Sequence, residues 1–174
     1  MGEIRLNIVL EDLILNIEET VKRAKENLSS VVNSTMTETY WLIGKYIVES
    51  EQNGNIKATY GSKLLSTLSK ELTLRLGKGY SRPNLNNMRK FYLRYPDYHL
   101  VSDKLSWSHI CELIKIDDDL ERSFYEKEAV SEKWGVRELQ RQMDSALFLR
   151  LAVSRDKEGI LSLAQEGIEI QTPE

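Results

Sequence analysis

The sequence LLSTLSKELTLRLGKGYSRPNLNNMRKFYLR, residues 64–94, carries the clearest structural signals in the chain. Leucines recur at helical spacing in its first half, so a helix is predicted over about residues 62–76. Gly77 follows, where a helix end favours a residue that can adopt positive φ. Ser81 then offers an oxygen to cap a second helix, which Pro96 must end because a proline disfavours helical geometry in the preceding residue. The pattern predicts a helix, a short turn and a second helix.

The second predicted helix has an apolar side and a polar side. The apolar side consists of Leu85, Met88, Phe91, Tyr92 and Tyr95; the polar side consists of Asn86, Asn87, Lys90 and Arg94, flanked by Arg82 and Arg89. In a helix-turn-helix protein the second helix enters the DNA major groove, where Asn can pair with adenine and Arg with guanine. The alternative is an ordinary solvated face on a core helix, and Leu93 interrupts the polar side.

Charge is distributed very unevenly along the chain. The 174 residues have a net charge of −3, but the segment from Lys57 to Arg94 holds nine basic residues and one acid. That segment therefore carries +8 and the remainder −11. Because lysine and arginine neutralise phosphates, this concentration favours duplex DNA as a partner. We predict groove positions for Arg82, Asn86, Asn87, Lys90 and Arg94, and phosphate contacts or electrostatic steering for Lys63, Lys70, Arg75, Lys78 and Arg89.

The N-terminal region is predicted to be a long helical arm. Apolar residues recur at alternating steps of four and three, as in a coiled coil: Leu10, Ile14, Ile17, Val21, Ala24, Leu28 and Val31. The stripe then shifts to Met36, Tyr40, Ile43 and Ile47, so either one helix spans about residues 8–51 or two helices break near residues 29–34. The stripe packs either on the chain's own domain, which we favour, or on a second copy in a homodimer.

The rest of the chain also has helical rather than strand-like periodicity. We predict a short helix after Ser106 or Ser108, one opened by Asp117–Asp119, and a final one whose inward residues run from Val136 to Leu151. Beyond Ser154 the pattern weakens. The prediction is an all-α, helix-turn-helix-type domain with five or six helices. It divides into an arm or hairpin (1–51), a core (52–155), and a C-terminal tail or start of a linker (156–174).

Composition excludes several other classes of protein. No apolar run is long enough to cross a membrane, and the single cysteine, Cys111, indicates a cytoplasmic protein without disulfides.

Asp117–Asp119 are expected to cap a helix rather than bind metal, and His109 is expected to be a partnered or solvated histidine rather than a general base. We predict no cofactor, no metal, no small-molecule substrate and no catalysis.

Several ordered motifs resemble the N-terminal domain of the YhcG family. They are YWLIGK (40–45), YGSKLL (60–65), LSKEL (68–72), GYSRPNL (79–85), MRKFY (88–92), LSWSH (105–109), FY (124–125) and WGVRELQRQ (134–142). The resemblance extends over about residues 10–160. It implies a helix-turn-helix-type, DNA-binding module that usually precedes a nuclease-like domain of the PD-(D/E)XK type.

The catalytic signature of that nuclease domain is not found in this sequence. It requires an Asp followed by Glu-x-Lys on adjacent strands, and the chain contains no Glu-x-Lys. Our reading is therefore a non-catalytic module that targets a nuclease-like domain to duplex DNA. The alternative is a protein-interaction or dimerisation module of a nuclease-associated system. We expect an isolated N-terminal domain, either an excised fragment or a naturally short protein.

Overall fold

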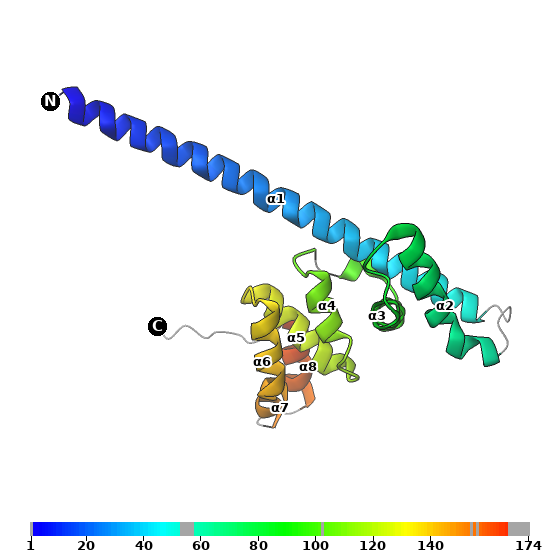
Figure 1. Cartoon of the computed structure of the whole chain (residues 1–174). Helices are drawn as coiled ribbons and strands as arrows, with labels where there is room; N and C mark the ends of the chain where they lie inside the picture. The colour runs from blue at the N-terminus through cyan, green and yellow to red at the C-terminus, as the bar shows by residue number, and fades with distance from the viewer. Residues whose placement is uncertain (1, 53–57, 102, 154, 156, 167–174) are drawn as a thin grey trace.

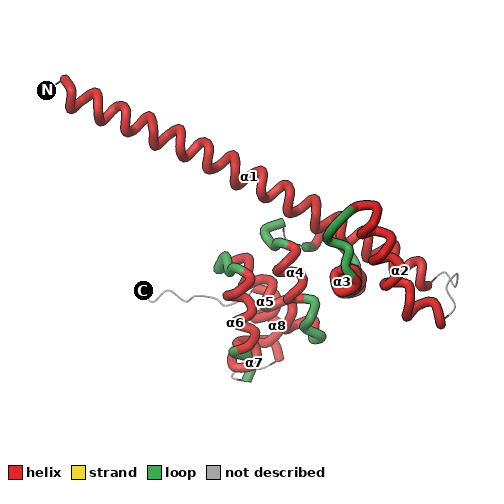
Figure 2. The backbone as a smooth tube through the Cα atoms, viewed as in Figure 1, coloured by secondary structure: helices red, strands yellow, loops and turns green. Residues whose placement is uncertain are grey.

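The computed structural model is all-α and describes residues 2–52, 58–101, 103–153, 155 and 157–166. Within these ranges, side chains are described from Ile14 onward, except those of residues 58–62, 100 and 166. The elements are α1 (Gly2–Gln52), α2 (Ala58–Leu76), α3 (Arg82–Arg94), the short 3-10 helix η1 (Tyr98–Leu100), α4 (Trp107–Leu113), α5 (Asp119–Ser131), α6 (Val136–Asp144), α7 (Leu147–Ala152) and α8 (Lys157–Glu166). No strand occurs in these ranges (Figure 2).

Helix α1 is one continuous helix and has no break near residues 29–34. Its C-terminal half lies against the other helices, whereas its N-terminal half projects away from them as a single rod (Figure 1). The apolar stripe of that projecting half is exposed to solvent; for example, 55% of Ile17 and 66% of Leu28 are accessible. The expectation that the stripe packs on the chain's own domain is therefore wrong for residues 14–32, because no other helix of the described chain reaches that part of α1.

The C-terminal half of α1 joins the body through a close helix crossing. Ile47 and Val48 are buried, and a Cβ atom built on Gly44 would overlap the backbone carbonyl of Met88 in α3. Only glycine lets the two backbones approach this closely. Across the same crossing, the Trp41 indole nitrogen donates a 2.7 Å hydrogen bond to the Tyr95 carbonyl oxygen. The crossing fixes α3 between α1 and the remaining helices.

Helices α2 and α3 form as their end signals predict. Gly77 has φ of +88° just after α2, and Ser81 accepts a hydrogen bond from the Asn84 backbone N–H as the N-cap of α3. Leu85, Met88 and Phe91 are fully buried, which confirms the predicted inner side of α3. Four leucines of α2 are only half-buried (Leu64, Leu65, Leu68 and Leu72), and Leu74 and Leu76 are exposed. Helix α2 is therefore the less firmly packed of the two.

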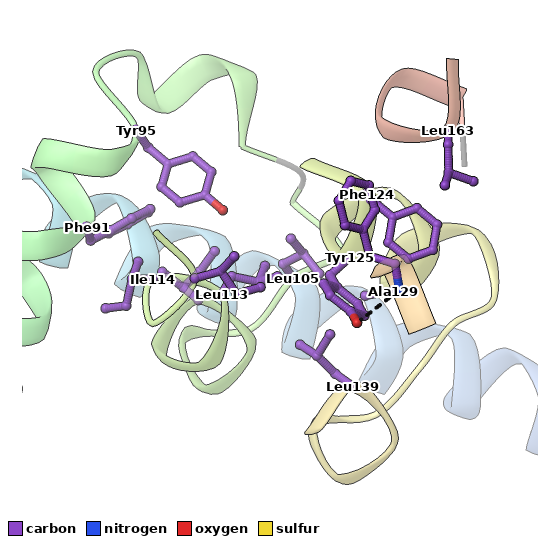
Figure 3. Close-up of a cluster of buried hydrophobic side chains, with 13 residues drawn as sticks. Phe91, Tyr95, Leu105, Leu113, Ile114, Phe124, Tyr125, Ala129, Leu139 and Leu163 are labelled. Carbon is purple, nitrogen blue, oxygen red and sulfur yellow. Dashed lines mark hydrogen bonds between the residues drawn. The ribbon is translucent and has the colours of Figure 1, made fainter. Parts of the chain in front are cut away.

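The main hydrophobic core lies among α3, α4, α5, α6, α7 and α8 (Figure 3). Phe124 and Tyr125 of α5 are completely buried at its centre. The Tyr125 hydroxyl accepts a 3.3 Å hydrogen bond from the Phe148 backbone N–H and donates one of 3.3 Å to the Gln142 carbonyl oxygen. These bonds let a tyrosine occupy the core without an unpaired hydroxyl. Trp41, Trp107 and Trp134 pack on the edge of this cluster and are half-buried.

The C-terminal third differs from the prediction in two places. The expected helix from Val136 to Leu151 is two helices, because Ala146 adopts a left-handed conformation with φ of +51° and separates α6 from α7. Residues 157–166, expected to belong to a tail or linker, form α8. Its Leu163 and Ala164 are buried, and the Ala164 carbonyl oxygen accepts a 2.7 Å hydrogen bond from Ser123 of α5.

Three sequence-based predictions fall outside the described residues. They are the loop that residues 53–55 predict, because glycine and asparagine tolerate positive φ, the contribution of Lys57 to the basic segment, and the tail at 167–174. The side chain of Leu10, the first member of the apolar stripe, also lies outside them. None of the helices in the described ranges combines the length and apolarity that a membrane-spanning segment requires.

Candidate nucleic-acid interface

Helix α3 is covered by other helices on several sides and leaves only a narrow strip in solvent. It packs against α1, α2 and α4. Arg82, Asn86 and Lys90 follow one another at steps of four residues along this strip, and Leu93 continues it with 47% of its surface exposed. Arg82 and Lys90 are exposed and pair with no acid among the described residues. These two cations are therefore available to an external partner.

Helix α2 and the turn add three further exposed cations. Lys63 and Lys70 lie two turns apart on one side of α2, and Lys78 lies in the turn between α2 and α3. None of the three forms an ion pair within the described part of the chain. Gly77 and Gly79 flank Lys78 with φ of +88° and +115°, so the turn depends on two glycines. Five of the ten predicted contact residues thus remain exposed and uncompensated.

Three of the arginines predicted to contact DNA instead form ion pairs with acidic residues of the chain itself. The Arg89 Nε–H donates to both carboxylate oxygens of Glu51 at the end of α1, with N–O distances of 3.0 and 2.8 Å. Arg94 pairs with the Asp117 carboxylate and donates a 3.2 Å hydrogen bond to the Asp117 carbonyl oxygen. Arg75 pairs with Glu71 one turn earlier in α2, at 3.3 Å. Arg89 and Arg94 consequently hold α3 in place.

Asn87 lies between α3 and α4 rather than on the exposed strip. Its side-chain amide nitrogen lies 3.6 Å from the sulfur of Cys111 and donates to it. Burial raises the pKa of the Cys111 thiol, and the hydrogen bond from Asn87 opposes that shift. Both groups are half-buried. The predicted groove role of Asn87 therefore conflicts with its inward contact, whereas half-buried Asn86 keeps a place on the strip.

Sequence reasoning missed the residue that ties the turn to the core. The Asn84 amide nitrogen donates a 2.5 Å hydrogen bond to the Gly79 carbonyl oxygen, and its oxygen accepts a 3.0 Å hydrogen bond from the Trp107 indole. One side chain thus connects the turn, the start of α3 and α4. Asn84 directly follows a proline near a helix N-cap, but the sequence contains no signal for its pairing with a tryptophan 23 positions away.

The two other candidate sites have structural explanations. Asp118 caps α5 by accepting a 2.8 Å hydrogen bond from the Glu121 backbone N–H, as predicted. His109 is a partnered histidine, also as predicted: its Nδ1 lies 2.8 Å from the Ser106 hydroxyl and its Nε2 lies 2.9 Å from the Trp134 carbonyl oxygen. Across the described residues no three or more His, Cys, Asp or Glu side chains converge into a potential metal site.

Comparison with known proteins identifies the family. Residues 16–150 match the family model described as the DUF1016 N-terminal domain. This chain belongs to that family. The matched segment starts in the projecting half of α1 and ends in α7, so it includes the crossing at Gly44 and the whole of the basic segment.

One curated relative agrees with the resemblance seen in the sequence motifs. A protein of Escherichia coli (strain K12) named "Putative nuclease YhcG" is 34% identical over an alignment that covers 81% of this chain and 46% of the relative. The chain thus spans about half the length of that relative, and it corresponds to the N-terminal domain of the YhcG family. No solved structure matches the chain.

Proposed function

We propose that this domain binds duplex DNA through α2, the turn and α3, and that in longer relatives it directs a nuclease-like domain to its substrate. The domain itself supplies no catalysis in this proposal. In helix-turn-helix terms, α2 is the supporting helix and α3 the helix that approaches the major groove. A cytoplasmic location suits both the DNA and the lone cysteine.

The observation that carries the proposal is the set of uncompensated cations on a protein with net negative charge. Lys63, Lys70, Lys78, Arg82 and Lys90 are all exposed, and none pairs with an acid among the described residues. The chain nevertheless contains more acids than bases, with 27 of the former and 24 of the latter. Between Lys63 and Arg94 the sequence offers one acid, Glu71, whereas six basic side chains elsewhere in the described chain pair with an acid three or four residues away, as Arg141 does with Glu138. A cluster of unpaired cations is the usual electrostatic footprint of phosphate binding.

The pairing of the arginines narrows the proposed contact set. Arg75, Arg89 and Arg94 already have carboxylate partners, so using them on DNA would require breaking those pairs. We therefore assign phosphate contacts to Lys63, Lys70 and Lys78. Arg82, Asn86 and Lys90 lie on the exposed strip of α3, and we assign to them the contacts with base edges in the major groove.

Fluorescence anisotropy with a mixed-sequence duplex, measured across a salt series, tests the proposal. Replacing two unpaired lysines that are assigned to phosphates, Lys70→Ala with Lys78→Ala, should weaken binding and flatten the plot of log K against log salt by about one unit per lost phosphate contact. A matched control, Lys127→Ala with Lys157→Ala, removes the same charge from exposed positions in α5 and α8. This control should leave the slope unchanged.

Two results would contradict the proposal. If the wild-type protein does not bind the duplex even at low salt, the domain is better explained as a protein-interaction module. If both double variants lose affinity equally, binding depends on total charge and not on the α2–α3 surface.

A further inference from the structure

The projecting half of α1 exposes a continuous apolar stripe. The exposed fractions are 42% for Ile14, 55% for Ile17, 48% for Val21, 66% for Leu28 and 61% for Val31, and Ala24 is also exposed. The charges on the outer side of the helix satisfy one another: Arg23 pairs with Glu19 at 2.5 Å and Lys22 with Glu26 at 4.0 Å. A long apolar stripe that is exposed to solvent, on a helix whose polar side forms its own ion pairs, indicates an interaction surface.

We propose that residues 14–31 of α1 pair with the same segment of a second copy of this chain, as an antiparallel two-helix coiled coil. The alternating steps of three and four residues are those of the a and d positions of a heptad. Ile14, Val21 and Leu28 occupy a positions, and Ile17, Ala24 and Val31 occupy d positions. The dimer therefore requires no residue outside the described helix.

Ala24 determines which orientation packs better. In a parallel, in-register pair Ala24 would face Ala24 of the second copy, and two methyl groups would leave a gap in the middle of the seam. In an antiparallel pair centred between residues 22 and 23, Ala24 faces Val21 instead. The flanking layers join Ile17 to Leu28 and Ile14 to Val31. Every layer of the antiparallel pair therefore contains at least one aliphatic side chain larger than alanine, and no layer consists of two alanines.

Charge favours the same orientation. Glu18 and Lys25 each follow a d position and so flank the stripe, and neither has an ion-pair partner in the described structure. In the antiparallel pair Glu18 lies opposite Lys25 of the second copy, and symmetry makes this contact twice. In the parallel pair Lys25 would face Thr20, and no opposite charges would meet. Charges that flank a coiled-coil seam are the feature that sets its orientation.

The pairing also fixes the distance between the two α2–α3 surfaces of the dimer. The relevance of this distance to DNA rests on the proposed function. Helix α3 crosses α1 at Gly44, far from the centre of the pair. At 1.5 Å per residue, the two crossings in the dimer are about 65 Å apart along α1. Two turns of B-DNA cover roughly 70 Å. Self-association can be measured without DNA, so its failure is distinct from a failure of DNA binding.

The first experiment measures mass in solution. Sedimentation equilibrium and light scattering at micromolar concentration should give twice the mass of the chain. Leu28→Glu should raise the dimer dissociation constant by about 100-fold, because symmetry places a carboxylate in two apolar layers. Leu15→Glu is the matched control: it makes the same change at a residue that is 58% exposed and lies one position off the stripe. This control should change the constant by less than about threefold.

The second experiment determines orientation by disulfide cross-linking in a Cys111→Ser background. Mixing chains that carry Ile14→Cys with chains that carry Val31→Cys should give a cross-linked pair, whereas Ile14→Cys alone should not. Independently, Glu18→Lys should weaken the dimer about threefold to tenfold, and adding Lys25→Glu to the same chain should restore it, because the pairs then re-form with exchanged signs.

Several outcomes would overturn the inference. A monomer at micromolar concentration would mean that another partner covers the stripe. Equal effects of Leu28→Glu and Leu15→Glu would place the dimer contact elsewhere. Cross-linking of Ile14→Cys to itself would show a parallel pair.

Discussion

The two halves of α1 carry similar apolar side chains but have opposite environments. Ile47 and Val48 are 4% exposed, whereas Ile17 is 55% and Leu28 is 66% exposed on the same uninterrupted helix. The difference lies in what crosses the helix. Gly44 admits the backbone of α3 in one half, and no element of the described chain reaches the other (Figure 1). An apolar stripe therefore predicts burial, but it does not identify the partner that provides it.

Filling the crossing should have the largest effect on the packed half. Gly44→Ala should lower the free energy of unfolding by about 3 kcal/mol, because the new methyl group would overlap the Met88 carbonyl and lie 3.1 Å from the Tyr92 Cβ atom. Urea unfolding followed by tryptophan fluorescence measures the change. Gly135→Ala is the control, since nothing lies within 4 Å of a Cβ there, and it should cost about 1 kcal/mol or less through a poorer N-cap. Equal stability of Gly44→Ala and wild type would disprove the close crossing.

The same truncation in the two halves should have different costs. Ile47→Ala should destabilise the monomer by about 2–4 kcal/mol, because it removes a buried side chain and leaves a cavity. Ile17→Ala should cost less than about 0.5 kcal/mol when measured at a concentration too low for self-association. Chemical denaturation of both variants under identical conditions gives the comparison. Similar losses would mean that the projecting half packs within its own chain.

The coupling energies of ion pairs should also differ between the packed and the projecting half of α1. A double-mutant cycle on Glu51 and Arg89, whose side chains are 25% and 33% exposed, should give a coupling energy of about 1 kcal/mol. A cycle on Lys22 and Glu26, which are 76% and 63% exposed and 4.0 Å apart, should give a coupling energy of about 0–0.3 kcal/mol. If the exposed pair proves as strong as the half-buried one, the projecting half is not fully solvated.

Removing the projecting half should have the smallest effect on the body. The contacts of α1 with the body begin near Ser34, whose carbonyl oxygen accepts a 2.9 Å hydrogen bond from Tyr98, and near Thr37, which is 2% exposed. A chain that lacks residues 1–32 should therefore unfold at the same urea concentration as a dilute full-length chain. The same truncation should abolish self-association. A large loss of monomer stability would show that the arm supports the body.

Local signals in the sequence predicted the α2–α3 region well. Gly77 and Ser81 bound the turn as expected, and the fully buried residues of α3 are those of its predicted apolar side. The break at Ala146 could not be predicted, because alanine there carries no signal for a left-handed conformation. Helix α8 was missed because its burial depends on α5, where Ser123 bonds to the Ala164 carbonyl oxygen from 41 residues earlier in the chain.

The candidate interface was only partly predictable for a similar reason. Sequence composition identified the basic segment, but it could not separate the unpaired cations from the paired ones. Arg89 meets an acid 38 residues away and Arg94 one 23 residues away, whereas Lys90 between them meets none among the described residues. Such pairings depend on helix crossings, which no local pattern records.

The sequence by itself determined the helical class, the ends of α2 and α3, the concentration of positive charge and the heptad spacing of the arm, since all of these depend on neighbours within a few residues. Only the tertiary structure decided which cations remain unpaired and which half of α1 is buried. Those outcomes depend on backbone approach between distant segments, and the crossing at Gly44 is the point where that approach is set.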